Sequence, residues 1–203
     1  MALFDIFKNQ VTSQLKREAS KAVNNAAQSA SQAIAKGRNH TESFTFASLP
    51  TSVEQLQALP EASLDSAFKT TALCIAVLCN LEKDANATWE MLDYLKGPED
   101  VSEREKAFIK ERLAGKQYKT LSFFKGATPD NGYTPATPYT ITVSENPYSF
   151  DAENWATLYV TSGGADSPRP IKLRRKPSTN QWFVNDIQCL ADIRIPTEQD
   201  AWA

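Results

Sequence analysis

The chain has few of the residues that enzymes use for nucleophilic and metal chemistry. It holds one histidine, His40, and three cysteines in 203 residues. A single histidine nearly excludes histidine-dependent triads and multi-histidine metal sites. The odd, irregularly spaced cysteines do not suggest a disulfide framework, and Cys74 and Cys79 lie in a strongly apolar run. We therefore expect both to be small core residues in a reducing compartment.

Other motifs that are absent exclude further classes of cofactor and partner. The sequence has neither a glycine-rich dinucleotide fingerprint after a strand nor a phosphate-binding loop with Gly-Lys-Ser/Thr, so we expect no nucleotide cofactor. The longest apolar stretch, Thr71 to Leu81, is too short to span a bilayer, and the N-terminus does not have the layout of a signal peptide. A net charge of −2 argues against a nucleic-acid partner for the body of the protein. These features predict a cytoplasmic protein without a cofactor.

Charge is divided unequally along the chain. Residues 1–38 carry six basic and two acidic side chains, a net charge of +4, whereas the remaining 165 residues carry 16 basic and 22 acidic ones, a net charge of −6. This division predicts a basic appendage ahead of an acidic domain.

The appendage has the pattern of a long amphipathic helix. Its apolar residues recur at steps of three and four, and it contains no proline before Gly37, a suitable terminator. The residues predicted to make contacts are Phe4, Phe7, Lys8, Lys16, Arg17 and Lys21. Such a helix suits an anionic membrane surface, with peripheral attachment, but its alanine-rich face equally suits self-association or docking on the body. A mobile segment is the third alternative.

The body begins with helical patterns. Ser52 with Gln55, and Ser102 with Glu105, form capping boxes. Between them, residues 64–79 are apolar nearly all round, which predicts a central core helix, and Gly97 followed by proline predicts the end of the next helix. The last helix is expected to bury Phe108, Ile109 and Leu113.

Strand patterns follow from residue 138. Short alternating runs are separated by turns too brief for crossover helices, which predicts an antiparallel sheet. The four predicted strands are 139–143, 156–161, 171–176 and 182–185, with Phe44 to Phe46 a candidate short strand ahead of the helices. The predicted class is α+β: a helical appendage at 1–38, a linker at 39–43, and one domain at 44–203 with helices at about 52–115 and the sheet at about 138–195.

Two loops are candidate ligand sites. Residues 126–138 hold three prolines and two glycines, a long irregular segment for a compact domain. There, Asp130, Asn131 and Tyr133 have groups that could bind a ligand by hydrogen bonds; alternatively, the segment is a packed connection anchored by Tyr133. In the second loop, Asp166, Ser167 and Arg169 suit a small anion or carboxylate. Alternatively, Asp166 and Arg169 pair with each other and stiffen a turn in which Gly163-Gly164 permits positive φ angles.

The run from Ile171 to Lys176 alternates between apolar and basic residues. Ile171 and Leu173 are expected to face the core, with Lys172, Arg174 and Lys176 on the opposite face. Three cations on one face suit either an acidic partner or a solvated edge strand that resists aggregation, and the edge strand is our prediction.

Several longer strings resemble a bacterial family classed only as a domain of unknown function. They are residues 95–98 (LKGP), 126–135 (GATPDNGYTP), 138–143 (PYTITV), 162–170 (SGGADSPRP) and 191–196 (ADIRIP). The resemblance covers about Ser43 to Ala203 and implies a bacterial, cytoplasmic protein. It brings no activity and no assigned catalytic residue.

The sequence therefore favours a non-enzymatic binding or interaction module, attached or assembled through its basic N-terminal helix. The rival hypothesis is a domain or enzyme that binds a small anion or carboxylate in a pocket between the helices and the sheet, lined by Tyr133, Asp166 and Arg169.

Overall fold

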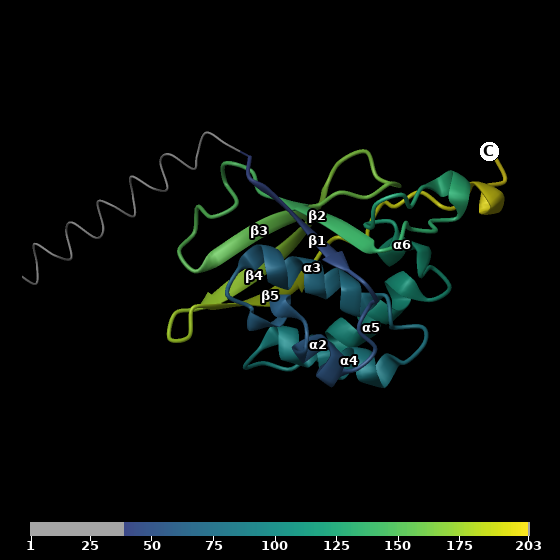
Figure 1. Cartoon of the computed structure of the whole chain (residues 1–203). Helices are drawn as coiled ribbons and strands as arrows, with labels where there is room; N and C mark the ends of the chain where they lie inside the picture. The colour runs from purple at the N-terminus through teal and green to yellow at the C-terminus, as the bar shows by residue number, and fades with distance from the viewer. Residues whose placement is uncertain (1–38, 203) are drawn as a thin grey trace, which may run out of the picture. The chain divides into compact units, whose positions relative to one another are not determined.

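The computed structural model describes residues 39–202, and the helix predicted for residues 1–38 lies outside them (Figure 1). Within the described part there are five α-helices: α2 (Val53–Gln57), α3 (Ala67–Leu78), α4 (Ala85–Lys96), α5 (Glu103–Leu113) and α6 (Tyr118–Leu121). The strands are β1 (Thr41–Phe46), β2 (Tyr139–Ser144), β3 (Trp155–Val160), β4 (Arg169–Lys176) and β5 (Gln181–Ile187). Short 3-10 helices occupy Pro60–Ser63 (η1), Pro129–Asn131 (η2) and Thr197–Gln199 (η3).

The strands form one antiparallel sheet in the order β1-β2-β3-β4-β5, which confirms the α+β class. The sheet has five strands rather than the predicted four, because β1 pairs with β2 along its whole length, from Thr41 opposite Ser144 to Phe46 opposite Tyr139. Three of the five residues predicted as a linker, Thr41 to Ser43, belong to this strand. The full length of β1 was not predicted because the strand is rich in polar residues. One of its faces is exposed, and only Phe44 and Phe46 are buried.

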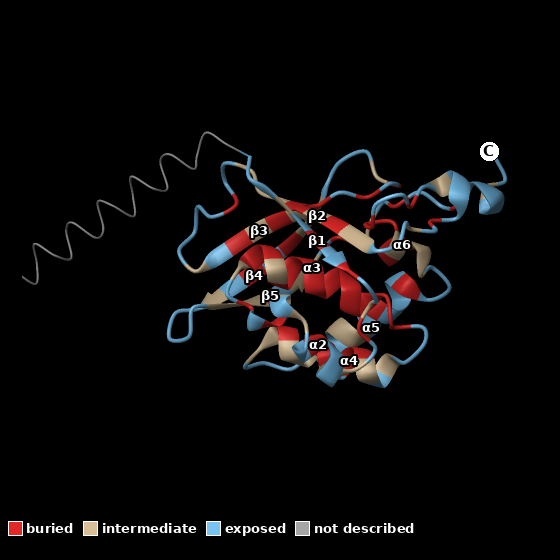
Figure 2. Cartoon of the chain, in the orientation of Figure 1, coloured by how far each residue is buried: buried red, intermediate tan, exposed pale blue. Residues whose placement is uncertain are grey.

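Helix α3 forms the centre of the core. All of its residues except Lys69 are buried, and it packs against all five strands, lying across one face of the sheet (Figures 1 and 2). This confirms the expectation from its apolar circumference. Cys74 and Cys79 are buried there, and burial raises the pKa of both thiols to about 12, which fits small, protonated core residues.

Local sequence signals explain where the helices begin and end. The capping box of Ser102 and Glu105 forms as predicted at the start of α5. At α2 only half of it forms: Ser52 Oγ accepts from Gln55 N, but Gln55 Oε1 accepts from Thr51 N instead of Ser52 N. Helix α4 ends at Lys96, and Gly97 adopts a φ of 79°.

The prediction that Phe108 is buried in the core is wrong. Phe108 is 43 % exposed, whereas Ile109 and Leu113 are buried. Ile109 and Leu113 are four residues apart and share a helix face, while Phe108 lies about 100° away from Ile109 around the helix. The Arg112 guanidinium covers part of the Phe108 ring instead, at 5.2 Å from its centroid.

Residues 39–202 include no helix with both the length and the apolar character needed to cross a membrane.

Candidate functional site

The two loops singled out in the sequence lie against each other. Gly163 N donates to Ser122 O at 2.8 Å, and Ser162 Oγ bonds Ser122 Oγ at 2.7 Å, just ahead of the first loop. Neither Gly163 nor Gly164 adopts the positive φ that glycine permits. The two glycines permit close approach instead: an ideal Cβ would lie 1.9 Å from Ala127 O at Gly163 and 2.0 Å from the Tyr133 hydroxyl at Gly164.

Tyr133 fills the space where the loops meet. Its side chain is completely buried, its hydroxyl donates to Arg194 O at 2.7 Å, and its ring stacks on Tyr118 with centroids 5.4 Å apart. Burial raises the pKa of Tyr133, so the phenol keeps the proton that it donates. Tyr133 therefore has the geometry of a buried anchor for the packed connection, the alternative to a ligand site in this loop.

The other two candidates in the first loop also have protein partners. Asn131 Oδ1 accepts from the backbone N–H groups of Thr128 and Thr134, and its Nδ2 donates to Gly126 O at 2.8 Å. Asp130 Oδ1 accepts from Thr197 Oγ1 at 2.8 Å, which joins η2 to η3.

The second loop does not form the ion pair proposed for it. Asp166 pairs with Arg194, and Arg169 reaches Asp192, donating from Nη2 to its backbone oxygen at 2.8 Å. Both partners lie in the segment after β5, more than twenty residues away, and spacing alone gave no sign of them. Ser167 is exposed. The structure thus brings three of the six candidates, Tyr133, Asp166 and Arg169, together around segment 192–194. Ligand binding by any of the six stays a prediction.

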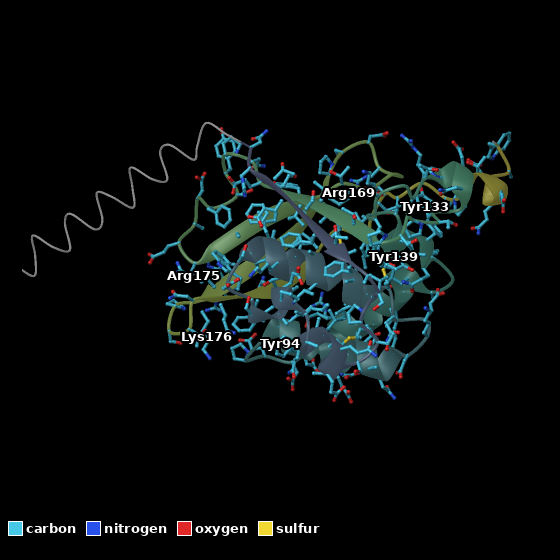
Figure 3. The ribbon with its side chains drawn as sticks, viewed as in Figure 1. Tyr94, Tyr133, Tyr139, Arg169, Arg175 and Lys176 are labelled. Carbon is cyan, nitrogen blue, oxygen red and sulfur yellow. The ribbon has the colours of Figure 1, made fainter. Side chains whose placement is uncertain are left out.

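A pocket of about 270 Å³ lies elsewhere, between the C-terminal end of α4 and the β4–β5 hairpin. We call it the cationic pocket. Its basic lining residues are Lys96, Arg174, Arg175 and Lys176, and its apolar ones are Pro98, Pro177, Phe183 and Val184. Glu99 and Asn185 complete the lining. Figure 3 shows Arg175 and Lys176 at one end of the sheet, away from Tyr133 and Arg169.

The cations of this pocket differ in how far they are neutralised. Lys96 pairs with Glu105. Partial burial works to raise the pKa of Glu105, but hydrogen bonds from Lys96 and Ser102 outweigh it, so the pKa is lowered and the carboxylate stays charged. By contrast, Arg174, Arg175 and Lys176 form no ion pair within residues 39–202. Arg175 donates to Asn180 Oδ1, a neutral amide oxygen, so its charge is not neutralised. The pocket therefore presents three positive charges without an ion-pair partner, and its lining holds one carboxylate, that of Glu99.

Neighbouring residues position the pocket walls. The Arg174 guanidinium lies 5.3 Å from the centroid of the Trp155 ring, its cross-strand neighbour on β3, which holds it by a cation–π contact. Opposite, the chain turns at Gly97 so close to Phe183 that a Cβ there would lie 2.4 Å from the ring. Glycine thus allows the end of α4 to carry Lys96 and Pro98 up to β5.

The prediction that β4 is an edge strand is wrong. It pairs with β3 on one side and β5 on the other. Ile171 and Leu173 are buried as expected, and Lys172 and Arg174 are exposed on the opposite face. The row of cations therefore does not protect a free edge, and contact with an acidic partner stays a prediction.

A second pocket, of about 350 Å³, lies beside the turn at residues 47–51 and is lined also by Asn80, Lys83 and Tyr139. Lys83 is the one charged residue in its lining, so it offers less for recognising a ligand. Among residues 39–202, no cluster of three or more His, Cys, Asp or Glu side chains is arranged to hold a metal ion.

Comparison with known families identifies the domain. A family model described as a domain of unknown function (DUF6935) matches residues 48–197. The chain belongs to this family. No curated protein and no solved structure matches the chain.

The DUF6935 match confirms the resemblance drawn from the sequence strings and includes every residue of the cationic pocket. It begins after β1, yet β1 pairs fully with β2, so the folded sheet extends beyond the matched residues. The sequence pattern indicated Arg174 and Lys176 as candidates to contact a partner, but it did not indicate Lys96, Arg175 or Phe183. A sequence signal for this pocket does exist: the basic strand is followed, across a short turn, by the aromatic pair Trp182-Phe183.

Proposed function

We propose that this DUF6935 domain is a non-enzymatic binding module of a bacterial cytoplasmic protein, and that it takes an oxyanion, a carboxylate or phosphate, in the cationic pocket. The observation that carries the proposal is the group of three cations without an ion-pair partner, Arg174, Arg175 and Lys176, beside an apolar wall formed by Phe183. Charge-assisted hydrogen bonds to such groups are about twice as strong as neutral ones. The apolar wall would hold the rest of the ligand.

The test is a titration of the full-length protein with inorganic phosphate and, separately, with succinate at constant ionic strength, followed by amide NMR shifts. We expect saturable shifts at Lys176 and Asn185. Removing one charged partner from such a site costs about 1.5–3 kcal/mol, so Lys176→Gln should weaken binding by about tenfold or more. The stronger of the two titrations identifies the oxyanion.

The matched control is Lys172→Gln. Lys172 is exposed on the same strand and the same face, but it does not line the pocket. The control should keep the affinity of the unaltered protein within about twofold, because exposed charges at a distance are screened by salt. Equal weakening by both variants, or shifts that never saturate, would show diffuse attraction rather than a site and would overturn the proposal.

We propose further, from the sequence, that residues 1–38 attach the domain to an anionic membrane surface or assemble it with a second copy. The support is the net charge of +4 combined with the apolar stripe that includes Phe4 and Phe7. Each cation near an anionic bilayer contributes about 1 kcal/mol.

Flotation with phosphatidylserine vesicles tests the attachment. Neutralising Lys16, Arg17 and Lys21 together should lower vesicle binding by roughly a hundredfold, since three cations contribute about 3 kcal/mol. If the protein does not float but forms oligomers that Phe4→Ala with Phe7→Ala dissociates, assembly is supported instead. Absence of both results would contradict this role for residues 1–38.

A further inference from the structure

The C-terminal segment carries an exposed tryptophan, and residues shortly before it are fixed to the domain. Thr197, in η3, donates to Asp130 and so fixes the segment to the domain. Beyond it, the backbone N–H of Trp202 donates to Asp200 Oδ1 at 2.9 Å, and the Trp202 side chain is 95 % exposed. An indole offers a large apolar area that a partner can bury, and here it is held out in solvent.

Acidic residues precede this tryptophan. Residues 196–202 contain Glu198 and Asp200 and no basic residue, and neither carboxylate forms an ion pair within the described chain. The segment therefore combines an aromatic ring with two carboxylates that no cation of the described residues neutralises, and one of them, Asp200, accepts a hydrogen bond from the Trp202 backbone.

The cationic pocket has the complementary chemistry. Its volume of about 270 Å³ lies just below the range of roughly 300–1,000 Å³ that is usual for drug-sized ligands, so it suits one large side chain better than a nucleotide. Phe183 and the two prolines offer an apolar wall for an indole. Arg174 and Lys176 offer partners for carboxylates, and a guanidinium beside an aromatic ring is favourable in itself.

We propose that the C-terminal segment of one copy binds the cationic pocket of a second copy, with Trp202 in the pocket and Glu198 and Asp200 facing Arg174 and Lys176. This inference rests on the proposed function, because it names the chain itself as a source of the anionic group. Trp202 lies outside the DUF6935 match, so the inference concerns this chain rather than the family.

The arrangement of the domain makes the contact intermolecular. Figure 1 places the C-terminus at the opposite end of the domain from the β4–β5 turn. Only five residues follow the anchored Thr197 in the described chain, a reach of at most roughly 18 Å. A contact between unlike surfaces propagates head to tail, and one this small belongs to the weak, transient class. We expect open-ended association that grows with concentration.

Sedimentation equilibrium at low ionic strength tests this. The full-length protein and each variant carry Phe4→Ala and Phe7→Ala, so that association through residues 1–38 does not contribute to the mass. The weight-average mass should rise with concentration past that of a dimer. Trp202→Ala and Lys176→Glu should each abolish the rise. Two matched controls should preserve it: Phe108→Ala, which removes another exposed aromatic, and Lys172→Glu, which reverses a charge on the same strand outside the pocket.

Mixing the two inactive variants gives the sharpest result. Trp202→Ala retains the pocket and Lys176→Glu retains the segment, so the mixture should form a one-to-one complex that grows no further. In this Phe4→Ala, Phe7→Ala background, three results would each overturn the inference: a mass that stays concentration-dependent in Trp202→Ala, a mass independent of concentration when both Trp202 and Lys176 are intact, or no complex on mixing.

Phosphate titration of the same variants separates the two proposals. If Lys176→Glu loses phosphate binding while Trp202→Ala leaves self-association unchanged, the C-terminal contact is wrong and the oxyanion site stands. If Lys176→Glu binds phosphate as well as the unaltered protein does, both are wrong.

Discussion

Gly163→Ala is expected to lower the free energy of unfolding by about 3 kcal/mol. The added Cβ would lie 1.9 Å from the carbonyl oxygen of Ala127, a backbone atom that cannot rotate away. Relieving such overpacking costs typically about 1–3 kcal/mol. Moving the loop also stretches the hydrogen bond from Gly163 N to Ser122 O, which contributes about 0.5–1.5 kcal/mol more. Urea unfolding followed by tryptophan fluorescence measures the change.

Gly115→Ala is the matched control. Gly115 has a φ of 65°, and nothing lies within 4 Å of a Cβ placed there. Gly115→Ala should therefore lower the free energy of unfolding only through the strain of the left-handed backbone, by about 1 kcal/mol. Because Gly163 does not have a positive φ, a loss at Gly163 that is no larger than the loss at Gly115 would show that the two loops are not interlocked.

Features that depend on a few neighbouring residues could be predicted from the sequence. The capping box at Ser102 and the helix end at Gly97 each depend on a hydrogen bond or a dihedral angle within a few residues. Helix α3 was recognisable because a helix with apolar residues all round is stable only when buried. The antiparallel sheet followed from turns too short for any other connection.

Features that depend on contacts between distant segments could not be predicted. The pairing of Asp166 with Arg194, and of Arg169 with Asp192, requires the chain after β5 to return beside the second loop. The position of β4 inside the sheet depends on how β5 folds back. The alternation of apolar and basic residues alone therefore could not decide whether the cations on β4 protect an edge strand or contact a partner. For the same reason the cationic pocket, which joins the end of α4 to β5, has no local signature beyond its separate parts.

Tyr133→Ala is expected to lower the free energy of unfolding by about 3–5 kcal/mol, the range for removing a large buried aromatic side chain. The lost ring leaves a cavity beside Tyr118 and Gly164, and segment 192–194 loses its hydrogen bond to the loop. Since the segment carrying Arg194 also holds Asp166, the change should loosen both loops together. Hydrogen exchange should show this as faster exchange at Gly163 N, which donates to Ser122 O.

Tyr133→Phe separates the role of an anchor from that of a ligand-binding residue. It keeps the ring and its stacking on Tyr118 but leaves Arg194 O without its donor, so we expect a loss of only about 1 kcal/mol in the free energy of unfolding. Phosphate and succinate titrations should be unchanged, because Tyr133 does not line the cationic pocket. If instead Tyr133→Phe leaves stability intact and abolishes anion binding, the two loops are the ligand site after all. The close approach of Gly163 and Gly164 would then serve to shape that site rather than to lock the packing of the domain.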